Sequence, residues 1–110
     1  MATTTYKTLG QSAPAATTST DLYTVPAATS AIISTVVITN RSATDATFRL
    51  SVSKLGAALA NADYLVYDAT VQGSGFITLT LGITMATTDK LRVYASTANL
   101  SFNAFGTEIA

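Results

Sequence analysis

Short runs of alternating apolar and polar residues recur about every ten residues along this chain, and turn-forming residues separate them. The clearest run is Ala46–Ser53, in which Phe48, Leu50 and Val52 share one face. The opposite face carries Thr47, Arg49, Ser51 and Ser53. A period of two residues is typical of a half-buried strand. The pattern predicts an all-β fold: a single antiparallel β-sandwich of about eight short strands, Ig-like or jelly-roll-like.

The same reasoning places the individual strands and the loops between them. Segments Lys54–Ala62 and Gly82–Asp89 are predicted as loops, the first with one helical turn. Phe105 breaks the parity of the last strand, which predicts a bulge near Asn103 and Ala104. In Phe76–Leu81 the apolar face would consist of Ile77, Leu79 and Leu81. The predicted strands are Thr4–Leu9, Leu22–Val25, Ala31–Thr39, Ala46–Ser53, Asp63–Val71, Phe76–Leu81, Leu91–Ser96 and Leu100–Ile109.

The first twenty residues allow two interpretations. Gly10–Thr20 is polar and rich in small residues, which is typical of a loop. Residues 1–20 are therefore predicted to form an N-terminal arm or a long loop of the single domain 1–110. An arm of this kind could add a strand to a neighbouring subunit. The alternative is a plain edge strand followed by a surface loop.

Few charges and no net charge limit the partners of the chain. Charged residues make up 11% of the 110 residues, and six basic residues balance six acidic ones. A nucleic-acid partner is not expected, because binding phosphates needs a basic surplus. Zero net charge favours association instead. The start of the chain lacks the pattern of a signal peptide, and no apolar run approaches the ~20 residues of a membrane span.

Side chains suited to catalysis are scarce. The chain has no histidine and no cysteine, so the usual general base and the thiolate ligands are missing. A glycosidase needs two converging carboxylates, but Asp63 and Asp68 are five positions apart and would face opposite ways. Asp21, Asp45 and Asp89 stand at turns, where aspartate bonds to the backbone. No enzyme activity, cofactor or metal is predicted, although loop aspartates leave a calcium site as a minor alternative.

The five tyrosines allow three interpretations. Their rings could stack on sugars, pack on strands with the hydroxyl exposed to water, or contact another protein. The lack of tryptophan favours packing over sugar binding. They are Tyr6, Tyr23, Tyr64, Tyr67 and Tyr94.

Three segments that cover nearly the whole chain carry a resemblance to a known family. They are LGQSAPAATTSTDLYTVPAATSAIISTVVITNRS (Leu9–Ser42), GAALANADYLVYD (Gly56–Asp68) and LTLGITMATTDKLRVYASTANLSFNAFGTEI (Leu79–Ile109). The chain resembles small virion structural proteins of tailed bacteriophages. It departs from that pattern before Asn40, where a small or polar residue other than threonine is common, and before Tyr64, where a basic residue or histidine is common.

The resemblance implies a capsid decoration or cement protein, which acts in the virion and is assembled in the host cytoplasm. Its partners would be the major capsid protein or other virion proteins, and it would form a homo-oligomer, with a trimer favoured. The alternative is a tail, neck or fibre-associated protein that recognises the host surface; a polysaccharide-cleaving enzyme is a weaker option. No nucleic-acid or membrane partner is predicted. The candidate assembly interface is Thr4, Tyr6, Leu9, Tyr23, Tyr64 and Tyr67.

Overall fold

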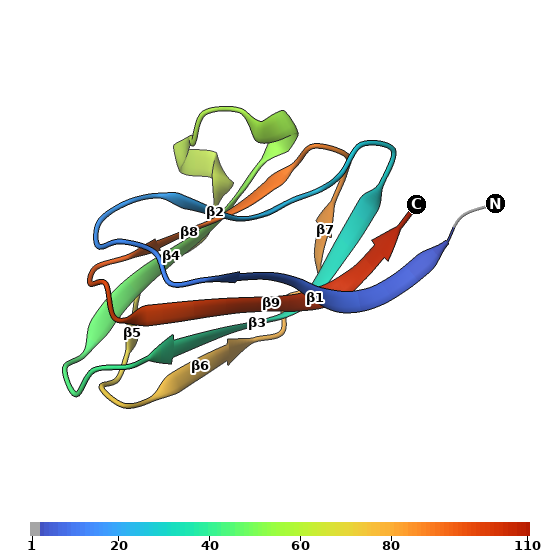
Figure 1. Ribbon diagram of the computed structural model, residues 1–110. Coiled ribbons are helices and arrows are strands. Elements are labelled where there is room, and N and C mark those ends of the chain that lie inside the picture. Colours follow the sequence, from blue (N-terminus) through green and yellow to red (C-terminus); the bar gives the residue numbers. More distant parts are fainter. Residues whose placement is uncertain (1–2) are drawn as a thin grey trace.

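The structure is a computed structural model that describes residues 3–110, and these form nine strands in two antiparallel sheets (Figure 1). The predicted all-β sandwich is confirmed, with nine strands in place of about eight. Residues 1–2 of the predicted N-terminal arm lie outside the described residues. Thr3 and Ala110, the first and last described residues, exchange two backbone hydrogen bonds and therefore lie side by side at one end of the molecule.

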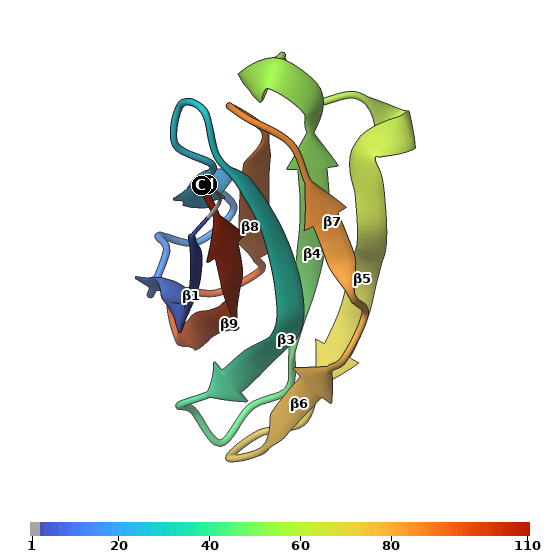
Figure 2. The same ribbon diagram turned by 90° about the vertical axis from the view of Figure 1, so that its right-hand side faces the viewer.

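The first sheet, sheet A, has the strand order β1-β9-β3-β6, and β7 pairs with the other half of β3. β6 and β7 therefore follow one another along the same neighbour (Figure 2). The strands are β1 (Thr4–Ser12), β9 (Leu100–Ile109), β3 (Ser30–Asn40), β6 (Phe76–Leu79) and β7 (Ile83–Met85).

The second sheet, sheet B, has the order β2-β8-β4-β5. Two 3-10 turns, η1 (Lys54–Gly56) and η2 (Asn61–Asp63), connect β4 to β5. Among residues 3–110 no helix has the length and apolar character needed to cross a membrane. The strands are β2 (Thr20–Thr24), β8 (Lys90–Ala95), β4 (Ala46–Ser53) and β5 (Tyr64–Val71).

The core lies between the two sheets and is built from the inward positions of both. Phe48 from sheet B meets Phe102 from sheet A edge to face, with ring centroids 6.1 Å apart. Leu91, Val93 and Ala95 face inward on β8, as the alternation predicts. The large side chains buried almost completely are Phe48, Phe102, Ile33, Ile38, Leu50, Met85, Leu91, Leu100, Val25, Val36, Val71 and Val93.

The loop predicted at Gly10–Thr20 is shorter than expected. β1 continues to Ser12 and β2 already begins at Thr20, so only residues 13–19 connect them. A Cβ added at Gly10 would overlap the carbonyl oxygen of Leu22 on β2. This glycine therefore marks a close approach between the two sheets, whereas its sequence context is that of a turn.

The loop predicted at Gly82–Asp89 is wrong at its start, because Ile83–Met85 forms β7. This strand is only three residues long, so its alternation is too short to detect from sequence. The strand before it ends at Leu79, where Leu81 was expected to continue its inner face. Ile77 and Leu79 do pack against the core, but Leu81 is 47% exposed.

The bulge predicted in β9 is also misplaced. β9 alternates regularly, with Leu100, Phe102 and Ala104 buried and Phe105 outward. The register shifts occur in its two neighbours, at Leu9 in β1 and Ser34 in β3. Both bulges lie beside Phe105, so the irregularity was correctly located along the sheet but assigned to the wrong strand.

The outward positions of β4 are less exposed than the alternation predicts. Ser51 and Ser53 are buried, because the segment Lys54–Asp63 covers this end of the outer side of sheet B. Val52 is only half-buried although it packs against the core. The predicted alternation of side chains along β4 was therefore correct, but the covering segment buries two outward side chains that were expected to be exposed.

Candidate assembly surface

The outer side of sheet A is defined by the parity of β3. Ile33 and Val36 both point into the core, so the bulge at Ser34 must absorb one extra residue between them. Side chains on either side of the bulge then project outward, among them Ile32 and Val37. β-branched residues favour strands, and here they serve the outside of the sheet as well as the core.

Strand register arranges these outward side chains in rows that cross the sheet. Residues paired directly across neighbouring strands share a face, so each row contains one residue from each strand it crosses. We call this surface the sheet A face. Its four central rows are Tyr6–Thr107–Ile32–Thr84, Thr8–Phe105–Thr35, Gln11–Asn103–Val37–Thr78 and Ser101–Thr39–Phe76.

Within the described residues, the sheet A face carries no charged side chain. All six basic and six acidic residues of the chain lie elsewhere, in loops, on sheet B or at the edge where β1 meets β2. Large apolar side chains are nevertheless exposed on it: Tyr6 is 81% exposed, Phe76 69%, Ile32 41% and Phe105 38%. Hydroxyl and amide groups fill the positions between them. Depletion of charge with exposed aromatic residues is the composition of the core of a protein interface.

The outer side of sheet B, the sheet B face, has the opposite character. The guanidinium of Arg49 lies between the rings of Tyr67 and Tyr94, at 4.2 and 4.3 Å from their centroids. The same group donates two hydrogen bonds to the Asp68 carboxylate, at 2.7 and 3.3 Å, and these raise the pKa of Arg49 above its ordinary value. Tyr64 contacts Tyr67 edge to face, with centroids 4.9 Å apart. The charges here are paired within the chain.

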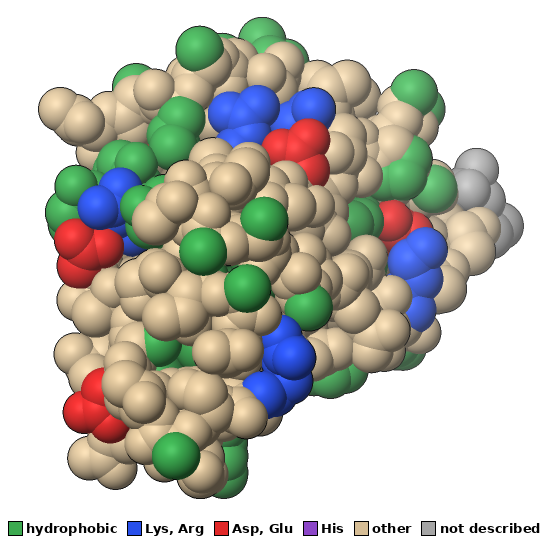
Figure 3. All heavy atoms as spheres, turned by 60° about the vertical axis from the view of Figure 1, so that its left-hand side comes forward, with side chains coloured by type: hydrophobic (Ala, Val, Ile, Leu, Met, Phe, Trp, Pro, Cys, Tyr) green, Lys and Arg blue, Asp and Glu red, His purple; other side chains and the backbone are tan. Residues whose placement is uncertain are grey.

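A second charged group fastens the covering segment to the sheet B face. Arg92 donates hydrogen bonds to the Ser53 hydroxyl, the Ala57 carbonyl oxygen and the Asp21 carboxylate, all within 3.0 Å. Lys90 also donates to Asp21, and this hydrogen bond is the main cause that lowers the pKa of Asp21. In Figure 3, most basic and acidic side chains accordingly lie in small mixed groups separated by uncharged surface, while an acidic and a basic side chain in the lower half of the view stand apart.

The two sheets are joined by a polar contact at the edge where β1 and β2 meet. The Tyr23 hydroxyl donates to Glu108 at 2.5 Å, and Lys7 pairs with the other oxygen of Glu108 at 2.8 Å. The hydrogen bonds from Lys7 and Tyr23 lower the pKa of Glu108. Burial, and then the contact with Glu108, raise the pKa of Tyr23.

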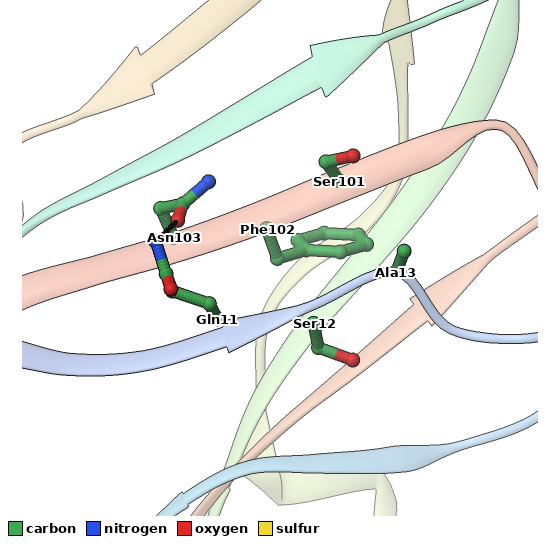
Figure 4. A pocket seen from close by; sticks show the side chains of 6 residues that line it. All are labelled: Gln11, Ser12, Ala13, Ser101, Phe102 and Asn103. Atoms are coloured by element: carbon green, nitrogen blue, oxygen red, sulfur yellow. Dashed lines mark hydrogen bonds between the residues drawn. The ribbon is translucent and has the colours of Figure 1, made fainter.

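The surface of residues 3–110 has hollows, two of which lie at opposite edges of the sandwich. One, of about 320 Å³, lies beside the ends of β1 and β9, where the Gln11 amide donates to Asn103 at 2.8 Å (Figure 4). The other, of about 470 Å³, lies at the opposite edge of the sandwich and is mainly apolar, with Val52, Leu65 and Leu81 among its lining residues. Neither is lined by a titratable side chain, so neither offers an acid, a base or a nucleophilic thiol.

The carboxylates have structural partners throughout the described chain. Besides the ion pairs above, Asp89 accepts hydrogen bonds from the backbone N–H groups of Leu55 and Ala86, Asp63 from Ala60, and Asp45 from Gly73. Residues 3–110 contain no group of three or more acidic residues placed to hold a metal ion. Asp45 and Asp89 thus bond to the backbone as predicted for turn aspartates, whereas the prediction was wrong for Asp21, which lies within β2 and pairs with the side chains of Lys90 and Arg92.

The residues predicted for the assembly interface are not brought together. Thr4 and Tyr6 are exposed on β1, while the bulged Leu9 packs against the core. Tyr23 is buried between the sheets, whereas Tyr64 and Tyr67 belong to the sheet B face. Sequence reasoning missed Ile32, Val37, Phe76 and Phe105. The outward parity of the predicted strands could have indicated them, but the prediction was centred on tyrosines.

No protein-family model matches the chain, and no curated protein sequence matches it at significant similarity. A functional assignment therefore rests on the fold and on the character of the two faces.

Proposed function

We propose that this chain is a structural protein of a bacteriophage virion, and that it acts as a capsid decoration or cement protein. The observation that carries the proposal is the uncharged sheet A face, on which Tyr6, Phe76, Ile32 and Phe105 are exposed. Such a surface suits contact with other proteins, and it has no group for catalysis or for binding phosphates. The resemblance to phage virion proteins supports the same role.

The proposed mechanism is binding by mass action. A protein that binds the assembled shell, and not its separated subunits, stabilises the shell by the free energy of that binding. The partner would be the major capsid protein or another virion protein, and copies of this chain would associate with one another. No covalent step is needed, so the hydroxyl-rich and aromatic surface is sufficient.

The test is the number of copies in purified virions of a phage that encodes this chain. Quantitative mass spectrometry against the major capsid protein should find on the order of hundreds of copies, because a symmetric shell repeats each attachment site many times. Particles that lack the chain should release their DNA at a lower temperature. Absence of the chain from virions would contradict the proposal as a whole.

A second candidate function is a tail, neck or fibre-associated protein that binds the host surface. The observation that favours it is the exposed aromatic group on the sheet B face, where Tyr67 is 58% exposed beside Arg49 and Tyr64. Residues 41–45 and 86–89, the parts of the two predicted loops that follow β3 and β7, would add to that recognition surface. About a dozen copies per particle, or fewer, would favour this function over shell decoration.

A further inference from the structure

We propose that the sheet A face binds the sheet A face of a second copy of this chain, so that two sandwiches pack face to face. The inference rests on the proposed assembly function and names the partner of the same surface. It predicts a dimer of the isolated protein, with no other virion component present.

Charge is the first argument for a second copy. In a face-to-face contact related by a two-fold axis, each group near the axis lies against its own counterpart. A charged group there would meet its like, which is unfavourable by several kcal/mol. The sheet A face avoids this cost because every outward position in its rows is uncharged, whereas the sheet B face carries Arg49, Asp68 and Arg92.

The position of the apolar side chains is the second argument. Phe105 lies on β9, one of the two central strands of sheet A, and Thr35 and Thr8 flank it in the middle row. Ile32 stands in the next row, and Tyr6 and Phe76 stand on the two outer strands. This arrangement places an aromatic residue at the centre of the contact, as in typical interfaces, and further aromatic residues towards both edges.

The size of the face is the third argument. β3 has 11 residues, which at about 3.3 Å each extend over roughly 36 Å, and the four neighbouring strands of sheet A lie about 4.8 Å apart. The sheet A face thus has an outline of roughly 36 × 19 Å, which is comparable with the ~800 Å² per partner that a standard stable interface buries. A second sandwich can pack on it at the spacing that the two sheets already adopt.

The test measures the mass of the purified chain by size-exclusion chromatography with light scattering. The expected mass is twice 11.3 kDa, and dissociation on dilution should depend little on salt, because no charges are expected to meet. A mass of one chain at all accessible concentrations would overturn the inference. A mass of three chains would also overturn it, since the trimer that the resemblance implies needs contacts between unlike surfaces.

Point variants identify the face. Thr35→Lys introduces a charge beside Phe105 in the middle of the sheet A face, and it should weaken dimerisation by at least about tenfold. Thr70→Lys is the matched control, since Thr70 is an exposed threonine that projects from the sheet B face on β5, and it should leave the mass unchanged. Circular dichroism checks that both variants fold, and the exposed Thr78→Lys on β6 replaces Thr35→Lys if that protein does not.

Mixing two oppositely charged variants tests the position of Thr35 in the dimer more directly. Thr35→Lys and Thr35→Glu should each be monomeric alone but should form a mixed dimer together, because the two opposite charges would then lie close to the axis. Equal effects of Thr35→Lys and Thr70→Lys would contradict the assignment of the face. The light-scattering sample contains no virions, so a monomeric result would contradict only the proposed dimer. Absence of the chain from purified virions would instead contradict the proposed function.

Discussion

The two outer faces of the sandwich differ in what they do with polar side chains. On the sheet B face, Arg49, Arg92 and their carboxylate partners are bound to one another, and the segment Lys54–Asp63 covers part of the surface. Across residues 3–110, the sheet A face has no charge, no covering segment, and exposed aromatic residues. The chain therefore uses its few charges to stabilise itself, and it leaves uncharged the surface that we assign to assembly.

The comparison also explains how a chain with 11% charged residues can display two different surfaces. Charges are concentrated where a segment or a side chain must be held, as at Arg92 and at Glu108. Because these pairs satisfy one another, they are poorly suited to attract a charged partner. Specificity on the sheet A face must then come from shape and from apolar contact.

The largest effect is expected from the residue that fastens the covering segment. Arg92→Met keeps the apolar stem but leaves Ser53 and the Ala57 carbonyl without their donor, and it should lower the free energy of unfolding by about 2–3 kcal/mol. Equilibrium unfolding in urea measures this loss. In the control Arg41→Met, one exposed hydrogen bond to Ala98 is removed, so the change should stay within about 0.5 kcal/mol. Equal losses would contradict the role of Arg92.

A smaller effect should come from the contact between the sheets. Tyr23→Phe removes the hydroxyl that donates to Glu108 and should lower the free energy of unfolding by about 1–2 kcal/mol near pH 7. The dimer should be unaffected, because Tyr23 is buried away from the sheet A face. If Tyr23→Phe weakened the dimer without lowering the free energy of unfolding, Tyr23 would belong to the dimer contact and not to the contact between the sheets.

The same contact predicts how stability depends on pH. The pKa of Glu108 is lowered in the folded chain, so its contribution is complete above the unfolded value of about 4.3 and is lost as the pH falls below it. The pKa of Tyr23 is raised, so its contribution is complete below about 10 and is lost as the pH rises further. Denaturant unfolding from pH 3 to 11 measures the loss of stability at low pH, the acid limb, and the loss of stability at high pH, the alkaline limb.

Three variants test the two limbs. Glu108→Gln should flatten the acid limb, while Asp21→Asn, which removes another carboxylate of lowered pKa, should flatten it independently of Tyr23. Tyr23→Phe should remove the alkaline limb and, because its hydroxyl also lowers the pKa of Glu108, should flatten the acid limb in part. An unchanged acid limb in Glu108→Gln would show that the pairing with Lys7 and Tyr23 contributes nothing to folding.

Sequence reasoning predicted the fold well but predicted the surface poorly, for physical reasons. Strand alternation is local, so the run around Phe48 and most other strands were predicted correctly. Pairing between distant strands is not local, and therefore the bulges at Leu9 and Ser34 and the short β7 were missed. The rows of the sheet A face depend on that pairing. Lack of charge in the sequence favoured a covered surface, but only the strand register identifies a candidate for it.

Removal of the exposed ion pair on the sheet B face should have a lesser effect than Tyr23→Phe. Asp68→Asn keeps a side chain that tolerates the left-handed backbone at this position, where φ is 54°, but it removes the charge that Arg49 binds. The loss of stability should shrink at high salt, because salt screens exposed pairs. Urea unfolding at low and high ionic strength measures it, and a loss independent of salt would point to geometry instead of charge.

The smallest effect on stability is expected from an exposed tyrosine of the sheet A face. Tyr6→Ser should change the free energy of unfolding of the dilute monomer by no more than about 0.5 kcal/mol, because the side chain is 81% exposed. Tyr67→Ser on the sheet B face should cost more, since that ring contacts both Arg49 and Tyr64. The order reverses for association: Tyr6→Ser should weaken the dimer and Tyr67→Ser should not. Unfolding and light scattering on the same two proteins test this reversal, and an equal ranking in both measurements would mean that the two faces do not divide stability and assembly between them.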